Sequence, residues 1–232
     1  DKPAGVAVHG GSGVSFGVIE QLRRARPGER FLELVHRLDK ETSGILLLAR
    51  KRSALTRLQD QFRARDTDKV YAALVRGHWP ARQRVIDLPL LRTLDAAGER
   101  HVRVVDAGHA EARRAITLVQ PLERFGAVAD APAACSLLDV TIKTGRTHQI
   151  RVHLSHGAHP ILGDPRYGDF AWNRAWARGE VLAGVRFARM FLHARRLRFA
   201  HPATGEAVDL ESPLPAECAA LLTALRGPIS ST

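Results

Sequence analysis

The stretch His36-Arg37-Leu38-Asp39-Lys40-Glu41-Thr42-Ser43-Gly44 decides how the rest of the chain is organised. It is a polar turn between two apolar runs, residues 31–35 and 45–49, which are short and rich in branched side chains. Such runs predict buried strands rather than helices. A histidine, an arginine and an aspartate within four positions are more than a reversal of the chain requires. We therefore expect chemistry at Asp39.

A structural role for Asp39 is the alternative. Its carboxylate could accept the backbone N–H groups of Thr42 and Ser43, as aspartates in turns often do. An isolated aspartate in a loop would favour that interpretation. The context of the whole chain favours the chemical one.

Four separated motifs, in a fixed order, carry a resemblance to a known family. They are Lys2-Pro3, the turn at 36–44, Lys69-Val70-Tyr71, and Gly145-Arg146-Thr147-His148-Gln149-Ile150-Arg151. With these motifs the chain resembles the RluA family of RNA pseudouridine synthases over most of its length. Residues 7–20 and 31–35 are most similar to the RluC branch, which acts on 23S ribosomal RNA.

The resemblance assigns roles to individual residues. It implies that Asp39 is the catalytic aspartate, Tyr71 the active-site tyrosine, and Arg151 the arginine that pairs with the aspartate. Arg37 is implied to fill the space left by a flipped base, and Leu192 to line the base pocket. The residues expected to contact RNA are Arg37, His36, Lys69, Arg146, His148 and Leu192.

The position of Arg151 gives an independent reason for a carboxylate partner. The sequence predicts a helix that is capped by Thr147, ends near Gly157 and buries Ile150 and Leu154. Arg151 falls in its first turn, where the helix macrodipole disfavours a cation. A carboxylate would stabilise it there, and Asp39 is the partner we expect.

Composition and charge limit the class of partner. The 232 residues are 45% hydrophobic, enough for one substantial core or for two lobes around a cleft. The formal net charge is +11, and five lysines against thirty arginines make it almost entirely guanidinium. Such a field favours a polyanion, and guanidinium forks suit phosphate. Charge thus predicts a nucleic acid as the partner, and the resemblance implies ribosomal RNA of the large subunit. We expect a monomer, with no membrane involved.

The cysteines and histidines are not arranged as a metal site. Cys135 and Cys218 lie far apart, and we expect two small core side chains in a reducing, cytoplasmic protein. The histidines of residues 148–159 lack the spacing of a zinc motif. We expect neither a metal nor another cofactor.

The remaining elements follow from hydrophobic periodicity. Strands are predicted at residues 5–8, 69–77, 136–142 and 191–199, with an antiparallel meander at 80–119. Helices are predicted from Ser15, from Ser53 to about Arg65, within 170–189, and from Pro213. Residues 121–134, rich in proline and alanine, are predicted to form a surface excursion.

Together these elements predict an α+β fold. We expect a mixed, largely antiparallel sheet with flanking helices, and a central catalytic cleft where the Asp39 turn meets the Arg151 helix. The resemblance names this the pseudouridine synthase fold. Residues 1–232 would form one catalytic domain. Because the chain opens at Asp1 inside a motif, the resemblance implies a small amino-terminal RNA-binding domain upstream.

The predicted activity is isomerisation of specific uridines to pseudouridine in 23S ribosomal RNA, by base flipping and an aspartate nucleophile. Asp39 would attack either C1′ of the ribose or C6 of the uracil. The rival class is a basic RNA-binding module without catalysis, for which charge alone would suffice. Asp39 argues against that class, since a carboxylate facing phosphates weakens binding. An aspartyl phosphotransferase or metal nuclease would need a second acidic residue beside Asp39.

Overall fold

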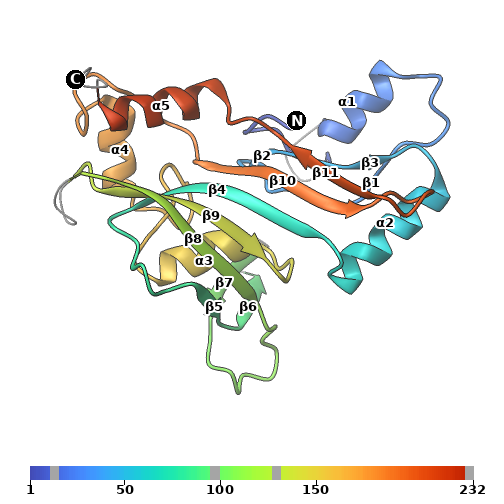
Figure 1. Ribbon diagram of the computed structural model, residues 1–232, viewed down its shortest axis with the longest axis horizontal. Coiled ribbons are helices and arrows are strands. Elements are labelled where there is room, and N and C mark those ends of the chain that lie inside the picture. Colours follow the sequence, from blue (N-terminus) through green and yellow to red (C-terminus); the bar gives the residue numbers. More distant parts are fainter. Residues whose placement is uncertain (11–15, 95–99, 127–131, 228–232) are drawn as a thin grey trace. The chain divides into compact units, whose positions relative to one another are not determined.

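The computed structural model of the chain describes residues 1–10, 16–94, 100–126 and 132–227. It divides into two compact units (Figure 1). The first unit comprises Asp1–Val70 and His193–Pro213, and the second comprises Tyr71–Leu192 and Leu214–Thr232. The boundary falls inside one strand, so Lys69 and Tyr71 belong to different units.

Five helices and eleven strands occur in the described residues. The helices are α1 (Val18–Ala25), α2 (Arg52–Ala64), α3 (Gln149–His156), α4 (Phe170–Arg178) and α5 (Ala216–Arg226). The strands are β1 (Glu33–Leu34), β2 (Ser43–Gly44), β3 (Leu48–Ala49), β4 (Asp68–Arg76), β5 (Val85–Asp87), β6 (Leu90–Leu94), β7 (Arg100–Val104), β8 (Ile116–Phe125), β9 (Cys135–Ile142), β10 (Leu192–Ala200) and β11 (Ala207–Glu211).

The first unit is built around the polar turn. The apolar runs beside the turn contain β1 and β3, which pair antiparallel, so the prediction of strands there is confirmed over a shorter length. The end of the turn is itself a strand, β2, and it lies parallel to β10. Strand β11 extends β10 on an antiparallel ladder.

The core of the first unit is formed where α2 packs against these strands. Leu58 is buried in it, and Leu55 and Phe62 pack alongside, as the spacing of the helix predicts. Val35, Ile45, Ala49, Leu197 and Phe199 complete this cluster. The two flanks of the turn therefore share one apolar core with β10.

The second unit contains an antiparallel sheet. Its strands follow the order β4-β9-β8-β5, and β8 pairs antiparallel with both β9 and β5. Strands β6 and β7 form a separate antiparallel ladder. Cys135 and Cys218 are both buried in the main apolar cluster of this unit with Trp172 and Trp176, so the expectation of core cysteines is confirmed. With one parallel pairing among antiparallel ones, the fold is the predicted α+β class.

Helix starts were the least accurate part of the prediction. The residue at the amino-terminal cap of α2 is Lys51 rather than Ser53, and that of α3 is His148 rather than Thr147. Helix α1 follows Gly17, and Ser15 lies outside the described residues. At α1, a glutamate inside the helix replaces a capping side chain at Gly17. Glu20 accepts the N–H groups of Gly10 and Gly17.

Two other predictions were wrong. Residues 5–8 form no strand, and the backbone of Lys2 instead pairs with that of Gly44. A surface excursion was predicted at 121–134, but its first part is a strand, because β8 continues to Phe125. An irregularity between Pro121 and Glu123 accommodates the proline, which has no N–H for the ladder. Residues 127–131 lie outside the described part.

Gly44 offers a test of how closely β2 fits against β10. Its φ is +108°, and a Cβ atom there would lie 2.3 Å from the carbonyl oxygen of Ala194. We predict that Gly44→Ala lowers the free energy of unfolding by about 2 kcal/mol or more, because the backbone angle and the contact are both unfavourable. Urea titration monitored by circular dichroism measures this loss.

The matched control is Gly28→Ala in the same unit, where an added Cβ meets nothing within 4 Å and φ is not positive. This variant should remain within about 0.5 kcal/mol of wild type. Equal stability of the two variants would contradict the close fit.

Candidate active site

The carboxyl end of the Asp39 turn is fixed by a buried pair of side chains. The hydroxyl of Ser43 and Nδ1 of His193 lie 2.9 Å apart, and Nε2 of His193 lies 3.2 Å from the carbonyl oxygen of Ser212. A carbonyl only accepts, so Nε2 carries the proton and Nδ1 accepts from Ser43. Ser43 and His193 are both buried. The pair therefore ties β2 to β10 from within.

Lys2 fixes the middle of the turn. Its ammonium donates to the carbonyl oxygens of Pro3, Val6 and Lys40, at 2.8, 2.8 and 3.0 Å. Lys40 directly follows Asp39, and the backbone of Lys2 is bonded in both directions to Gly44. Although the lysine is buried, these acceptors hold its charge. The main chain next to Asp39 is thus bound to the start of the chain.

His36 fixes the amino end of the turn. Its Nε2 accepts the N–H of Leu47 at 3.0 Å, and its ring stacks on Phe62 with centroids 4.8 Å apart. The ammonium of Lys69 lies 5.0 Å from the centroid of the same Phe62 ring. Burial, together with the charge of Lys69, lowers the pKa of His36 to about 4. His36 is therefore neutral at pH 7, as an acceptor at Nε2 must be.

Between these anchors the turn presents two of the predicted residues. Asp39 is half-buried and Arg37 is exposed. The N–H of Thr42 donates to the main-chain carbonyl of Asp39 at 3.1 Å. This bond closes the turn through the backbone, so reversing the chain does not require the Asp39 carboxylate to bind that N–H.

In the second unit, Arg151 forms a buried ion pair with Asp164. Its Nε and Nη2 atoms donate to the two carboxylate oxygens at 2.7 and 2.8 Å. The backbone N–H groups of Arg166 and Tyr167 also donate to Asp164. Burial alone would raise the pKa of Asp164, but the hydrogen bonds and charge of Arg151 lower it below its usual value. The carboxylate is therefore ionised, and it aims the guanidinium.

Tyr167 packs on the same arginine. The guanidinium of Arg151 lies 5.1 Å from the centroid of the ring, and the hydroxyl of Tyr167 lies 2.9 Å from Nδ1 of His148. Burial raises the pKa of Tyr167, so the phenol stays protonated. His148 adopts the left-handed conformation as it begins α3. The Tyr167 ring thus connects His148, a predicted RNA-contacting residue, with Arg151.

The other predicted site residues differ in burial and are divided between the two units. Tyr71 and Leu192 are buried, at 9% and 3% exposure, and Arg146 is exposed in the turn before α3. His36, Arg37, Asp39 and Lys69 belong to the first unit, whereas Tyr71, Arg146, His148, Arg151 and Leu192 belong to the second. The cleft and the Asp39–Arg151 pair stay predictions.

Asp164 is the residue that sequence reasoning missed. Arg151 did need a carboxylate, but the turn-forming run Gly163-Asp164-Pro165 predicted only a reversal. A buried helix arginine followed by an aspartate within a tight turn was the available signal. Ser43, His193 and Lys2 were likewise not recognised as anchors, because their partners are distant in sequence or are backbone atoms.

The described residues contain neither a metal-binding cluster nor a membrane-spanning helix. No group of three or more His, Cys, Asp or Glu side chains there is placed to hold a metal ion. No helix in that part of the chain has the length and apolarity needed to cross a membrane.

Comparisons with known proteins identify relatives of the chain. The RNA pseudouridylate synthase family matches residues 1–156. Over 231 residues the chain is 46% identical to ribosomal large subunit pseudouridine synthase C of Pasteurella multocida, covering 100% of this chain and 66% of that protein. The protein of the same name from Escherichia coli K12 is 48% identical over 214 residues, with coverages of 92% and 62%. The chain thus spans slightly less than two thirds of these curated relatives.

Solved structures give the same similarity. Human RNA pseudouridylate synthase domain containing 4 superposes with a TM-score of 0.72 at 29% identity, covering 97% of this chain and 88% of that one. Human RNA pseudouridylate synthase domain containing 1 gives 0.71 at 28% identity, with coverages of 98% and 89%. The predicted fold is therefore confirmed.

The lowered pKa of His36 predicts a pH dependence of stability. Between the ordinary value of 6.5 and about 4, the unfolded chain binds a proton at this position that the folded chain does not. Stability should therefore fall as the pH is lowered through that window. His36→Gln, which does not titrate, should show a smaller fall in melting temperature than wild type between pH 7 and pH 4.5.

His109→Gln is the control, because His109 is exposed and far from the turn in sequence. It should keep the pH dependence of wild type. A His36→Gln curve parallel to that of wild type would rule out the neutral, anchoring histidine.

The Arg151–Asp164 pair predicts a large effect of one substitution. Asp164→Asn should destabilise the protein by about 3–5 kcal/mol, because it leaves a buried guanidinium without its counter-charge. Asp60→Asn, which removes a carboxylate from an exposed pair with Arg63, should cost less than about 1 kcal/mol. Denaturant titration of both variants gives the comparison, and equal small losses would argue against the buried pair.

Proposed function

Because the chain belongs to the RNA pseudouridylate synthase family, we propose that it converts specific uridines to pseudouridine in large-subunit 23S ribosomal RNA. The match over residues 1–156 carries this proposal, since that range includes Asp39, Tyr71 and Arg151. Relatives at 46% and 48% identity bear the name ribosomal large subunit pseudouridine synthase C.

Asp39 is the proposed nucleophile. Its carboxylate attacks either C1′ of the ribose or C6 of the uracil, after which the detached base turns and is rejoined to the ribose through C5. The reaction is an isomerisation, so it needs neither an oxidant nor an external source of energy. The anchors on both sides of the turn support this role, because a nucleophile works best on a backbone whose position is fixed.

Arg151 is proposed to keep Asp39 ionised and directed towards the substrate. A guanidinium near a carboxylate lowers its pKa, and a fork held by a second carboxylate presents its remaining N–H groups in a set direction. Asp164 supplies that second carboxylate, which Arg151 binds through Nε and Nη2. Asp164 is thus a positioning residue in this proposal.

The remaining predicted residues are proposed to handle the flipped uridine. Arg37, exposed beside Asp39, would stack in the gap that the base leaves, at an unstacking cost of a few kcal/mol. Tyr71 would lie under the base and accept its C5 proton, and Leu192 would line the base pocket. The proposed contacts to RNA in addition to Arg37 and Leu192 are His36, Lys69, Arg146 and His148.

A basic RNA-binding module without catalysis is the second candidate. The charge of +11 would serve it equally well. It gives no reason for a half-buried carboxylate on a turn held at three points. The catalytic proposal explains both the carboxylate and the rigidity around it.

We propose a cytoplasmic monomer whose RNA affinity is increased by a small RNA-binding domain outside this catalytic domain. Two free, buried cysteines fit a reducing compartment. The metal-free mechanism follows from the use of a carboxylate nucleophile, which needs no Lewis acid.

Asp39→Asn tests the mechanism. We predict that it abolishes isomerisation and leaves RNA affinity equal or slightly higher, because it removes a nucleophile together with one negative charge. Release of tritium from RNA labelled at C5 of uridine follows the reaction directly, and filter binding follows affinity. Asp66→Asn, another exposed-loop carboxylate of the first unit, is the control and should turn over like wild type. Near-normal turnover by Asp39→Asn would remove Asp39 from the mechanism.

A further inference from the structure

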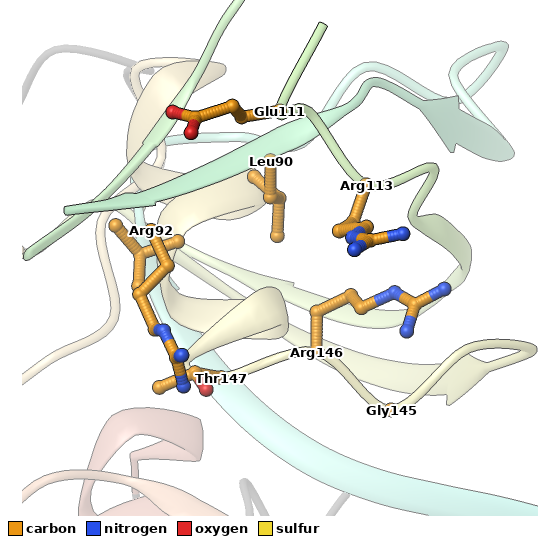
Figure 2. Close-up of a pocket in the computed structure, with 8 residues that line it drawn as sticks. Leu90, Arg92, Glu111, Arg113, Gly145, Arg146 and Thr147 are labelled. Atoms are coloured by element: carbon orange, nitrogen blue, oxygen red, sulfur yellow. The ribbon is translucent and has the colours of Figure 1, made fainter.

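A cavity in the second unit is lined by residues that the proposed mechanism, apart from Arg146, does not use. Its volume is about 400 Å³. The lining residues are Leu90, Arg92, Val102, Glu111, Arg113, Gly145, Arg146 and Thr147 (Figure 2). Three arginines from three separate segments thus line one cavity. Asp39, Tyr71 and Arg151 are not among its lining residues.

The backbone at each arginine is fixed. Arg92 lies on β6 directly opposite Val102 on β7, and the backbone of Arg113 is bonded in both directions to that of Leu90 at 2.9 Å. The N–H of Arg146 donates to the side chain of Gln149 at 3.1 Å, and its Nε donates to the carbonyl of Arg114. The guanidinium groups are therefore attached to rigid positions although they reach solvent.

The apolar side of the cavity belongs to the core. Leu90 and Val102 are both buried and pack with Ala115 and with Val152 of α3. Figure 2 shows Leu90 between the arginines, with Arg92 extending towards Thr147. The cavity thus combines an apolar floor with a charged rim, which is the usual composition of a ligand site.

The rim of the cavity carries a net positive charge. Three guanidinium groups and the single carboxylate of Glu111 give the lining a net charge of +2. Within the described residues neither Arg92 nor Arg113 forms an ion pair, whereas the neighbouring Arg114 is bound by Asp87 through two hydrogen bonds. Among its described residues, the lining of the cavity thus favours an anionic ligand.

We propose that this cavity binds one nucleotide of the substrate RNA, with its phosphate on Arg92, Arg113 and Arg146 and its sugar or base against Leu90 and Val102. The volume is at the lower end of the usual range for ligand pockets, which fits a single nucleotide. Guanidinium forks match phosphate oxygens in pairs, and an unpaired nucleotide is the form in which RNA offers both a phosphate and an apolar face. RNA as the ligand rests on the proposed function.

The double variant Arg92→Gln with Arg113→Gln tests this site. The probe is 23S ribosomal RNA transcribed in vitro, bound to the whole chain on filters over a series of salt concentrations. Because both arginines bind the same phosphate, their loss should reduce the slope of log affinity against log salt by about 0.7–0.9, and affinity at low salt should fall about tenfold or more. Arg146 is left unchanged, since its side chain also binds the carbonyl of Arg114.

The control removes the same charge elsewhere in the second unit. Arg174→Gln with Arg178→Gln alters two exposed arginines of α4 that do not line the cavity. It should bind RNA almost as wild type does and release tritium at the same rate. Equal losses in the two double variants would show a general effect of net charge and overturn the site.

A change in the opposite direction keeps the test decisive if the double variant does not fold. Glu111→Gln removes the one carboxylate of the cavity, so it should strengthen RNA binding at low salt more than Glu206→Gln, an exposed control in the first unit. Equal affinities of these two variants would overturn the site. Tritium release is measured in parallel. If the cavity variants lose RNA binding selectively but the wild-type chain never releases tritium, the proposed function is contradicted and the binding site is not.

Discussion

The parallel pairing of β2 with β10 is the constraint on which the first unit depends. Two residues of the polar turn, Ser43 and Gly44, lie opposite His193 and Ala194. The pairing requires a left-handed glycine, because the carbonyl of Ala194 occupies the space of a Cβ. The Ser43–His193 hydrogen bond adds a buried side-chain link at the same place. A polar segment that would otherwise be a mobile loop thereby becomes part of a sheet.

This constraint explains why the turn tolerates so much polarity. The polar groups that anchor it have specific partners: the Lys2 ammonium has three carbonyls, the Ser43 hydroxyl has His193, and His36 has the N–H of Leu47. Unsatisfied, any of these groups would cost about 1–3 kcal/mol. These anchors lie on both sides of Arg37 and Asp39, so the main chain that carries the two proposed substrate-contacting residues is fixed.

The sequence predicted helices and strands well where the apolar residues were clearly periodic. It predicted helix starts poorly where a side chain inside the helix takes the place of an ordinary capping residue. The stripe of Leu55, Leu58 and Phe62 identified α2, but the start of α1 depends on Glu20 acting from within the helix. The need of Arg151 for a carboxylate could be deduced from the helix macrodipole. Its partner Asp164 was missed, because the signal was only an aspartate in a tight turn and the contact itself is tertiary.

The arginines of this chain divide into two groups, and the division matters more than the total charge. Arg151 is held by the buried Asp164 and Arg114 by the exposed Asp87, so each has an aspartate of the fold as its partner. Arg92 and Arg113, in the described part of the chain, have no such partner. The net charge of +11 attracts any polyanion over a distance of about 10 Å at moderate salt. Under the proposal above, guanidinium groups on a fixed backbone then decide where a phosphate comes to rest, because their forks direct paired N–H donors at its oxygens.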